Sequence, residues 1–209
     1  MLTARSLVEA QTYVSLRLSE RDNPPVEPGQ PVPALTFGDA PPLRAGTNLV
    51  EGPDSWTYHS PVGEIVIPYV SEKTSIEVGS PFGLGRSRLI DAAEWVRVGY
   101  LYQNVALAEM MKYAGEPDPT SNDFQHTERR RHIRNSYELA VDAILQAMAF
   151  LPEGDHGGDQ VADADIWSQF GTSAKLANPY LVTRARLEDD LETFRGMLED
   201  FDNFYSSLD

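Results

Sequence analysis

The most constraining feature of the sequence is a row of large apolar residues near its C-terminal end. The row consists of Leu187, Leu191, Phe194, Leu198, Phe201, Tyr205 and Leu208. Its members are spaced 4, 3, 4, 3, 4 and 3 positions apart, so on a helix they form one seam that faces a partner along its whole length. We predict a helix over residues 179–208, with Asn178 as N-cap and Pro179 at its first position.

Two other segments are predicted to be long helices. Residues 87–114 include eleven consecutive residues without a charged side chain, from Val98 to Ala108. In a chain rich in charged residues, such a helix is either the central helix of the domain or one whose outer side meets another subunit. Residues 123–151 carry an apolar helical stripe and stop at Pro152.

The N-terminal part divides into a helix and an arm. Ser6 and Glu9 have capping-box spacing, so a helix is expected within residues 1–23, although residues 14–18 also alternate in hydrophobicity as in a strand. Residues 24–53 contain eight prolines, which excludes a helix or a central strand and predicts an extended arm. Such an arm either lies on its own domain or embraces a neighbouring subunit.

Residues 54–78 are predicted to form a small antiparallel sheet. Trp56 and Tyr58 alternate with polar residues, a Pro-Gly turn follows, and residues 64–70 and 74–78 are expected to be the second and third strands. The expected fold class is therefore α+β and mainly helical. It has three long helices, a small antiparallel sheet and a proline-rich extended arm, with residues 54–209 as the α+β core.

The charge of the chain indicates the solvent for which it is built. It has 32 Asp plus Glu against 17 Lys plus Arg, a net charge of −15, and only three of its basic residues are Lys. The excess negative charges repel one another at low salt, but the length over which salt screens them falls from about 10 Å at 0.1 M to about 3 Å at 1 M. Acid excess, few lysines and no cysteine resemble proteins of extreme halophiles, chiefly haloarchaea and their viruses. The alternative is an ordinary acidic protein from a GC-rich genome.

The same composition bounds location and partners. We expect a soluble protein of the virion or the cytoplasm in a high-salt environment, because no apolar run suggests a membrane span or a signal peptide. A surface this negative argues against nucleic acid as a partner. The absence of cysteine excludes disulfides and thiolate metal sites.

Four arginines gather at the start of the predicted helix 123–151, where the helix dipole disfavours cations. They are Arg129, Arg130, Arg131 and Arg134. Ion pairs within the chain or between subunits are one interpretation, and Arg134 has Glu138 one turn further on. Contact with phosphate is the other. These arginines and the first six residues of the seam are our interface candidates.

Two loops contain residue types that bind ligands. Residues 80–87 lie between a predicted strand and a helix, as in a phosphate-binding loop, but Pro81 removes a backbone donor and no lysine follows, so a glycine-rich connection is the simpler interpretation. Residues 153–165 hold four aspartates and a histidine, yet their spacing matches no calcium loop. Whether this acidic loop binds a cation stays open.

We expect a protein that is not an enzyme, without catalytic residues, cofactor or metal. The chain contains no nucleophile elbow and no His-Glu-x-x-His sequence, and its four histidines are scattered. An extended arm, an uncharged helix and a terminal seam instead favour an assembly subunit that forms homo-oligomers with neighbouring assembly proteins.

The first 18 residues, Met-Leu-Thr-Ala-Arg-Ser-Leu-Val-Glu-Ala-Gln-Thr-Tyr-Val-Ser-Leu-Arg-Leu, resemble the starts of head–tail connector adaptors of tailed viruses. That resemblance implies a largely helical subunit of a ring between portal and tail. The expected function is therefore a head–tail connector or another virion protein of a halophilic tailed virus. The alternatives are a small acidic protein that neutralises a basic partner, in the manner of an immunity protein, and, as a third, an enzyme acting on a small ligand.

Overall fold

The structure is a computed structural model that describes residues 1–22, 47–116, 121, 123–153 and 158–206. The helices in these ranges are α1 (Leu7–Asp22), α2 (Tyr69–Val78), α3 (Ala92–Ala114), α4 (Phe124–Met148), α5 (Gln169–Ala177) and α6 (Arg184–Ser206), with a short 3-10 helix at Asp163–Asp165. The strands are β1 (Leu2–Thr3), β2 (Asn48–Glu51), β3 (Ser55–Ser60) and β4 (Gly63–Pro68). The predicted α+β class, mainly helical with three long helices, is confirmed.

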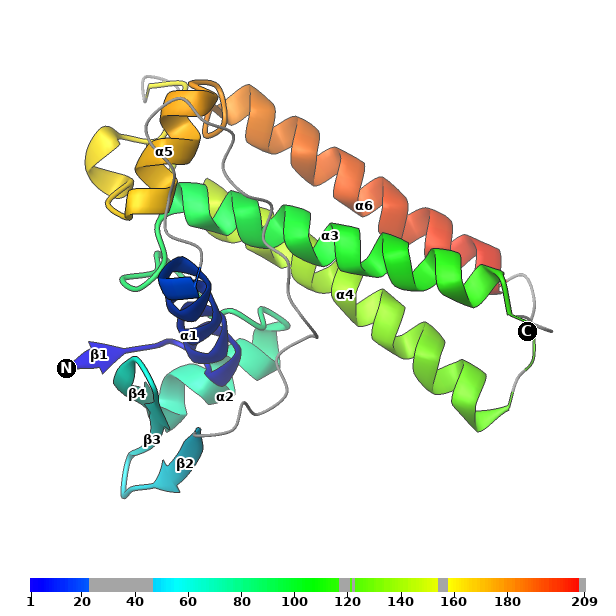
Figure 1. Cartoon of the computed structure of the whole chain (residues 1–209), viewed down its shortest axis with the longest axis horizontal. Coiled ribbons are helices and arrows are strands. Elements are labelled where there is room, and N and C mark those ends of the chain that lie inside the picture. The colour runs from blue at the N-terminus through cyan, green and yellow to red at the C-terminus, as the bar shows by residue number, and fades with distance from the viewer. Residues whose placement is uncertain (23–46, 117–120, 122, 154–157, 207–209) are drawn as a thin grey trace.

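The three long helices α3, α4 and α6 lie side by side as a bundle (Figure 1). Gly99 allows α3 to approach α4 closely, because a Cβ atom there would lie 2.9 Å from the Ile144 side chain. The first half of α3 is buried by its neighbours, so this part is the central helix that one of our two interpretations predicted. The second half exposes one side.

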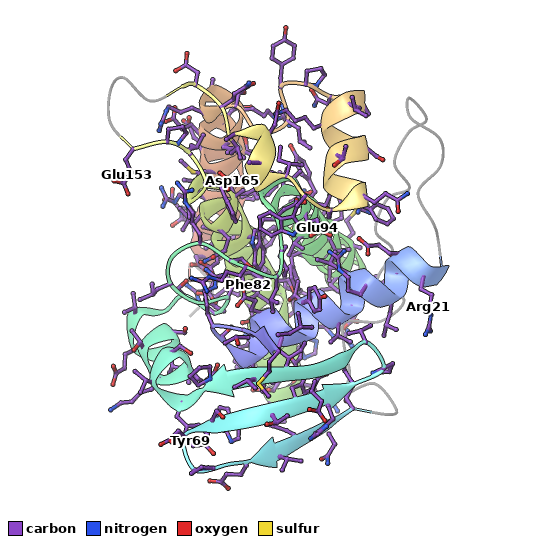
Figure 2. All side chains as sticks on the ribbon, turned by 90° about the vertical axis from the view of Figure 1, so that its left-hand side faces the viewer. Arg21, Tyr69, Phe82, Glu94, Glu153 and Asp165 are labelled. Carbon is purple, nitrogen blue, oxygen red and sulfur yellow. The ribbon has the colours of Figure 1, made fainter. Side chains whose placement is uncertain are left out.

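The four strands form a sheet in the order β1-β4-β3-β2. β3 pairs antiparallel with β4 and β2, but β1 pairs parallel with β4, so the sheet is mixed rather than purely antiparallel as predicted. Tyr58, Ile65 and Ile67 are buried on one face. α1 covers that face and lies between the sheet and the long helices (Figure 2).

The predicted strand at residues 74–78 is wrong, because these residues belong to α2. The left-handed conformation of Gly79, with φ 72°, ends this helix. Its N–H donates to the Ile76 carbonyl at 3.2 Å, and the Ser80 N–H donates to the Ser75 carbonyl at 3.0 Å. These two bonds satisfy the last carbonyls of the helix, which outweighs the strand preference of its β-branched residues.

Three of the predicted long helices have boundaries that differ from the structure, and α4 ends at Met148 rather than at residue 151. α6 begins at Arg184 rather than at residue 179, because Asn178 ends α5 and its side chain accepts the Tyr180 N–H at 3.2 Å in a turn. α3 begins at Ala92 rather than at residue 87, after the N-cap Asp91. The helix α5 itself was not predicted.

The N-terminal predictions are met in part. Residues 14–18 are helical, and the Ser6 hydroxyl accepts the Glu9 N–H at 3.0 Å as a capping box requires. The Glu9 carboxylate, however, accepts from the Arg5 N–H at 2.6 Å. Of the predicted arm, residues 24–46 lie outside the described residues, while Asn48–Glu51 form the edge strand β2. Leu208 of the seam also lies outside them.

Candidate functional site

The apolar seam of α6 packs inside the bundle of the chain itself. Its described members are buried or partly buried there: Leu187, Leu191, Phe194, Leu198, Phe201 and Tyr205. The ring of Phe194 meets that of Tyr100 on α3 edge-on at 5.3 Å between centroids, and Phe201 lies 5.8 Å from Tyr137 on α4. The partner of the seam is therefore the α3–α4 pair, and these six candidates lie in the core of the chain.

Arg134 joins two helices of the bundle. It pairs with Glu138 one turn further along α4, and its Nε lies 2.9 Å from the Asp202 carboxylate on α6. The hydrogen bond to Asp202 is the main reason that the pKa of Arg134 is raised. The group is half exposed, so the pair is expected to contribute at most about 1 kcal/mol.

The other three arginines also have partners within the chain: Arg129 pairs with Glu116, Arg131 with Glu128 at 2.6 Å, and Arg130 donates to the Ser121 carbonyl at 3.0 Å. The Arg130 guanidinium also lies over the Tyr205 ring, 5.6 Å from its centre. This arrangement favours internal ion pairs over a phosphate contact, because groups of the same chain already compensate the positive charges of the four arginines.

The loop at residues 80–87 already holds a carboxylate where a phosphate would bind. The Phe82 N–H donates to Asp142 of α4 at 3.0 Å, and the Ser80 hydroxyl donates to the same carboxylate at 3.2 Å. The Gln146 amide donates to the Gly83 carbonyl at 2.9 Å. Burial raises the pKa of Asp142. The loop is therefore a connection fastened to α4, as the simpler interpretation predicted.

Sequence reasoning missed a buried ionic cluster at the start of α3. Glu94 is fully buried and pairs with Arg17 of α1, and Figure 2 places Glu94 at the centre of the molecule. Asp91, also fully buried, accepts the Glu94 N–H at 2.9 Å and the Ser168 N–H at 2.7 Å. Ser168 is the N-cap of α5. The cluster therefore ties α1, α3 and α5 together.

Burial dominates the protonation of this cluster. It raises the pKa of Glu94 to about 8, against the opposing effect of the Arg17 charge. It also lowers the pKa of Arg97 to about 10, and the guanidinium of Arg97 lies 4.1 Å from the centre of the Phe170 ring. The Asp91-x-x-Glu94 spacing of a capping box was the visible sequence signal, but the distant partners carried none.

A second polar contact joins α3 to α6. The Tyr100 hydroxyl donates to Asp190 at 2.6 Å, and Arg186 contacts both groups. Burial and the hydrogen bond to Asp190 raise the pKa of Tyr100 to about 12. A phenol that keeps its proton in this way is a structural donor at neutral pH rather than a base.

The acidic loop at residues 153–165 is described only in part, because residues 154–157 lie outside the described ranges. Asp163 pairs with Lys175 at 2.5 Å, and Asp165 lies 3.6 Å from Arg86. Among the described residues, no group of three or more His, Asp or Glu side chains is placed to hold a metal ion.

Several described elements expose large apolar side chains, and two sets of these side chains bear on function. The first set, which we call the α2 surface, consists of Val70, Ile76 and Val78, which are 78, 71 and 61% exposed and are distributed around the outer side of α2 with the exposed Lys73–Glu77 pair among them. Ile76 also borders a groove of about 230 Å³ between α1 and α2, large enough for one apolar side chain.

The second set, which we call the α3 stripe, consists of the apolar residues Leu107, Ala108 and Met111 and the polar residue Asn104. All four are exposed, with Leu107 at 37% and Met111 at 68%. Their spacing of i, i+3, i+4 and i+7 places them on one side of the helix. This is the outward side of the uncharged segment that the sequence singled out.

No protein-family model, curated protein or solved structure matches the chain. None of the described helices has the length and hydropathy needed to cross a bilayer. The helices and strands of this chain define its fold class as α+β, and the contacts of its residues are the basis for a proposed function.

Proposed function

We propose that this chain is a non-enzymatic structural subunit of a larger assembly, namely a head–tail connector or another virion protein of a halophilic tailed virus. The observation that carries the proposal is the presence of two separate apolar surfaces. The α2 surface lies beside the sheet, whereas the α3 stripe lies on the helical bundle (Figure 1). A subunit placed between neighbours needs more than one contact surface.

Both surfaces consist of side chains that a solitary acidic protein gains nothing by exposing. Leu107, Ala108 and Met111 gather on one side of α3. Large apolar groups that gather outside the core mark sites of interaction more often than scattered single residues do. The resemblance of residues 1–18 to connector adaptors agrees with this proposal. The net charge of −15 supports the high-salt part of it, because molar salt removes the repulsion between like subunits.

Light scattering during a KCl titration from 0.1 M to about 3 M tests the proposal, with negative-stain electron microscopy of the high-salt sample. We expect a mass above that of the monomer in molar KCl and closed particles in the images. Substituting Ile76→Glu on the α2 surface should reduce the particles, while Thr193→Glu on the exposed side of α6 should leave them unchanged. A monomer at every salt concentration and at high protein concentration would overturn the proposal.

One observation favours the alternative, a small acidic protein that neutralises a basic partner. The outer side of α6 exposes five carboxylates that form no ion pair with any other described residue: Glu188, Asp189, Glu192, Glu199 and Asp200. They extend over twelve steps of the helix, or about 18 Å at 1.5 Å per residue. Such a face would speed association with a cationic surface at low salt.

Binding of polylysine separates the two candidate functions. The alternative predicts an affinity that falls steeply between 0.05 and 1 M KCl and that is reduced by neutralising Glu188 and Glu192 to glutamine. The assembly function predicts the opposite salt dependence, with association that strengthens as KCl rises.

A further inference from the structure

We infer that the α3 stripe is a self-association surface, which packs against the α3 stripe of a second copy of this chain. This inference rests on the proposed function and names the partner of one of its two surfaces.

The charge of the stripe identifies its occupant. Between Val98 and Ala114 the only charged residues of α3 are Glu109 and Lys112, and these neutralise each other at 2.7 Å. A basic partner would find a single carboxylate on α3 along this segment, that of Glu109, and Lys112 already neutralises it. A second copy carries the same net charge of −15, so it can approach closely only where neither surface presents acidic groups. The uncharged side of α3 meets that condition, whereas the outer side of α6 does not.

The shape of the stripe suits a helix pair with two-fold symmetry. A two-fold contact uses the same patch on both copies, so that Leu107 of one copy contacts Met111 of the other and the reverse. Ala108 lies between these two larger side chains and allows the helix axes to approach. Met111 has a flexible side chain that adapts to such a contact.

The size of the stripe sets the strength of the contact. Seven helical steps from Asn104 to Met111 span about 10 Å. Such a short seam buries less than the roughly 800 Å² per partner of a stable dimer. We therefore expect an association that requires high protein concentration and molar KCl, and that dissociates in dilute buffer.

Sedimentation equilibrium of the full chain at 0.1 M and about 2 M KCl measures this contact. Met111→Glu places one carboxylate from each copy at the contact and should raise the dimer dissociation constant at least tenfold in 2 M KCl. Met111 is mostly exposed, so this variant should fold, and far-UV circular dichroism checks that it does. Leu176→Glu is the matched control, because Leu176 is an exposed apolar residue on α5 and should leave the constant unchanged. Equal dissociation constants for wild type and Met111→Glu would overturn the inference.

Because the chain has no cysteine, a single introduced thiol locates the contact. With a short bis-maleimide reagent in 2 M KCl, Ala108→Cys should give a covalent dimer, and Ala185→Cys on the exposed side of α6 should stay monomeric. Equal dimer yields from the two variants would overturn the inference. Particles that form in 2 M KCl and are lost in Ile76→Glu, but not in Met111→Glu, would overturn it while leaving the proposed function standing. A monomer under every condition would overturn both.

Discussion

Replacing Glu94 by glutamine should remove a large part of the pH dependence of folding. In the unfolded chain this carboxyl has its ordinary pKa of 4.5, whereas burial raises its pKa to about 8 in the folded protein. Between these values the folded state holds a proton that the unfolded state has lost, so the free energy of unfolding falls as the pH rises. The difference of about 3.5 pH units corresponds to about 5 kcal/mol, at 1.36 kcal/mol per unit.

The Glu94→Gln substitution also removes one of the hydrogen bonds that the Glu94 carboxylate accepts. One carboxylate oxygen of Glu94 pairs with Arg17, and the other accepts the Asp91 N–H at 3.3 Å. A glutamine side chain has a single acceptor oxygen, so one of these two donors loses its partner at a cost of about 1–3 kcal/mol. The Glu94→Gln protein should therefore be less stable than wild type at pH 5, and should gain on wild type by about 4 kcal/mol between pH 5 and pH 9, the part of the full change that falls within this range.

Urea unfolding followed by tryptophan fluorescence at pH 5, 7 and 9 measures this difference at constant KCl. Asp142 and Asp190 also have a raised pKa, but both proteins contain them and their effect cancels in the comparison. Glu188→Gln is the matched control, because it makes the same chemical change on the exposed side of α6. A stability difference between wild type and Glu94→Gln that is constant from pH 5 to pH 9 would refute the reasoning.

Four further predictions concern packing and charge. Leu187→Ala removes a fully buried side chain of the seam and should lower the free energy of unfolding by about 2–5 kcal/mol in urea. Gly196→Ala adds a methyl group that meets nothing within 4 Å and should stabilise α6 by up to about 1 kcal/mol. Gly171→Ala should destabilise the protein, because its Cβ would lie 2.5 Å from an Asp91 carboxylate oxygen. Raising KCl from 0.1 to 2 M should raise the Tm of the wild type, and a lower Tm would contradict the role given to its net charge.

Two of the three long helices, α4 and α6, were predictable because each carries a repeated local pattern. The seam of α6 and the stripe on α4 have helical period over several turns, and that period survives in the structure. α2 is short and contains β-branched residues that favour a strand, so the left-handed glycine at its end decided the outcome. The seam shows the limit of such patterns, because its period requires a partner helix without saying whether that helix belongs to the same chain.

The buried cluster around Glu94 could not be predicted in the same way. Arg17 is 77 positions from Glu94 along the chain, and Ser168 is 77 positions from Asp91. A chain with 32 carboxylates and 17 basic residues allows many ion pairs by chance, so the sequence does not reveal which pair is specific. Only the fold, which brings α1 and α5 to the start of α3, selects this pairing.

This selection matters because it adds polar contacts to the apolar core that the sheet, α1 and the helical bundle share. α1 covers the sheet and is fixed to α3 by the Arg17–Glu94 pair, and the loop that follows α2 is fixed to α4 by Asp142. The α2 surface lies on the sheet side of this junction and the α3 stripe on the bundle side (Figure 1). Two carboxyls whose pKa is raised by burial therefore contribute to their relative position, beside the shared apolar core. An assembly that uses both surfaces should therefore respond to pH more strongly than the α3 contact alone, because only the former requires the junction to keep one geometry.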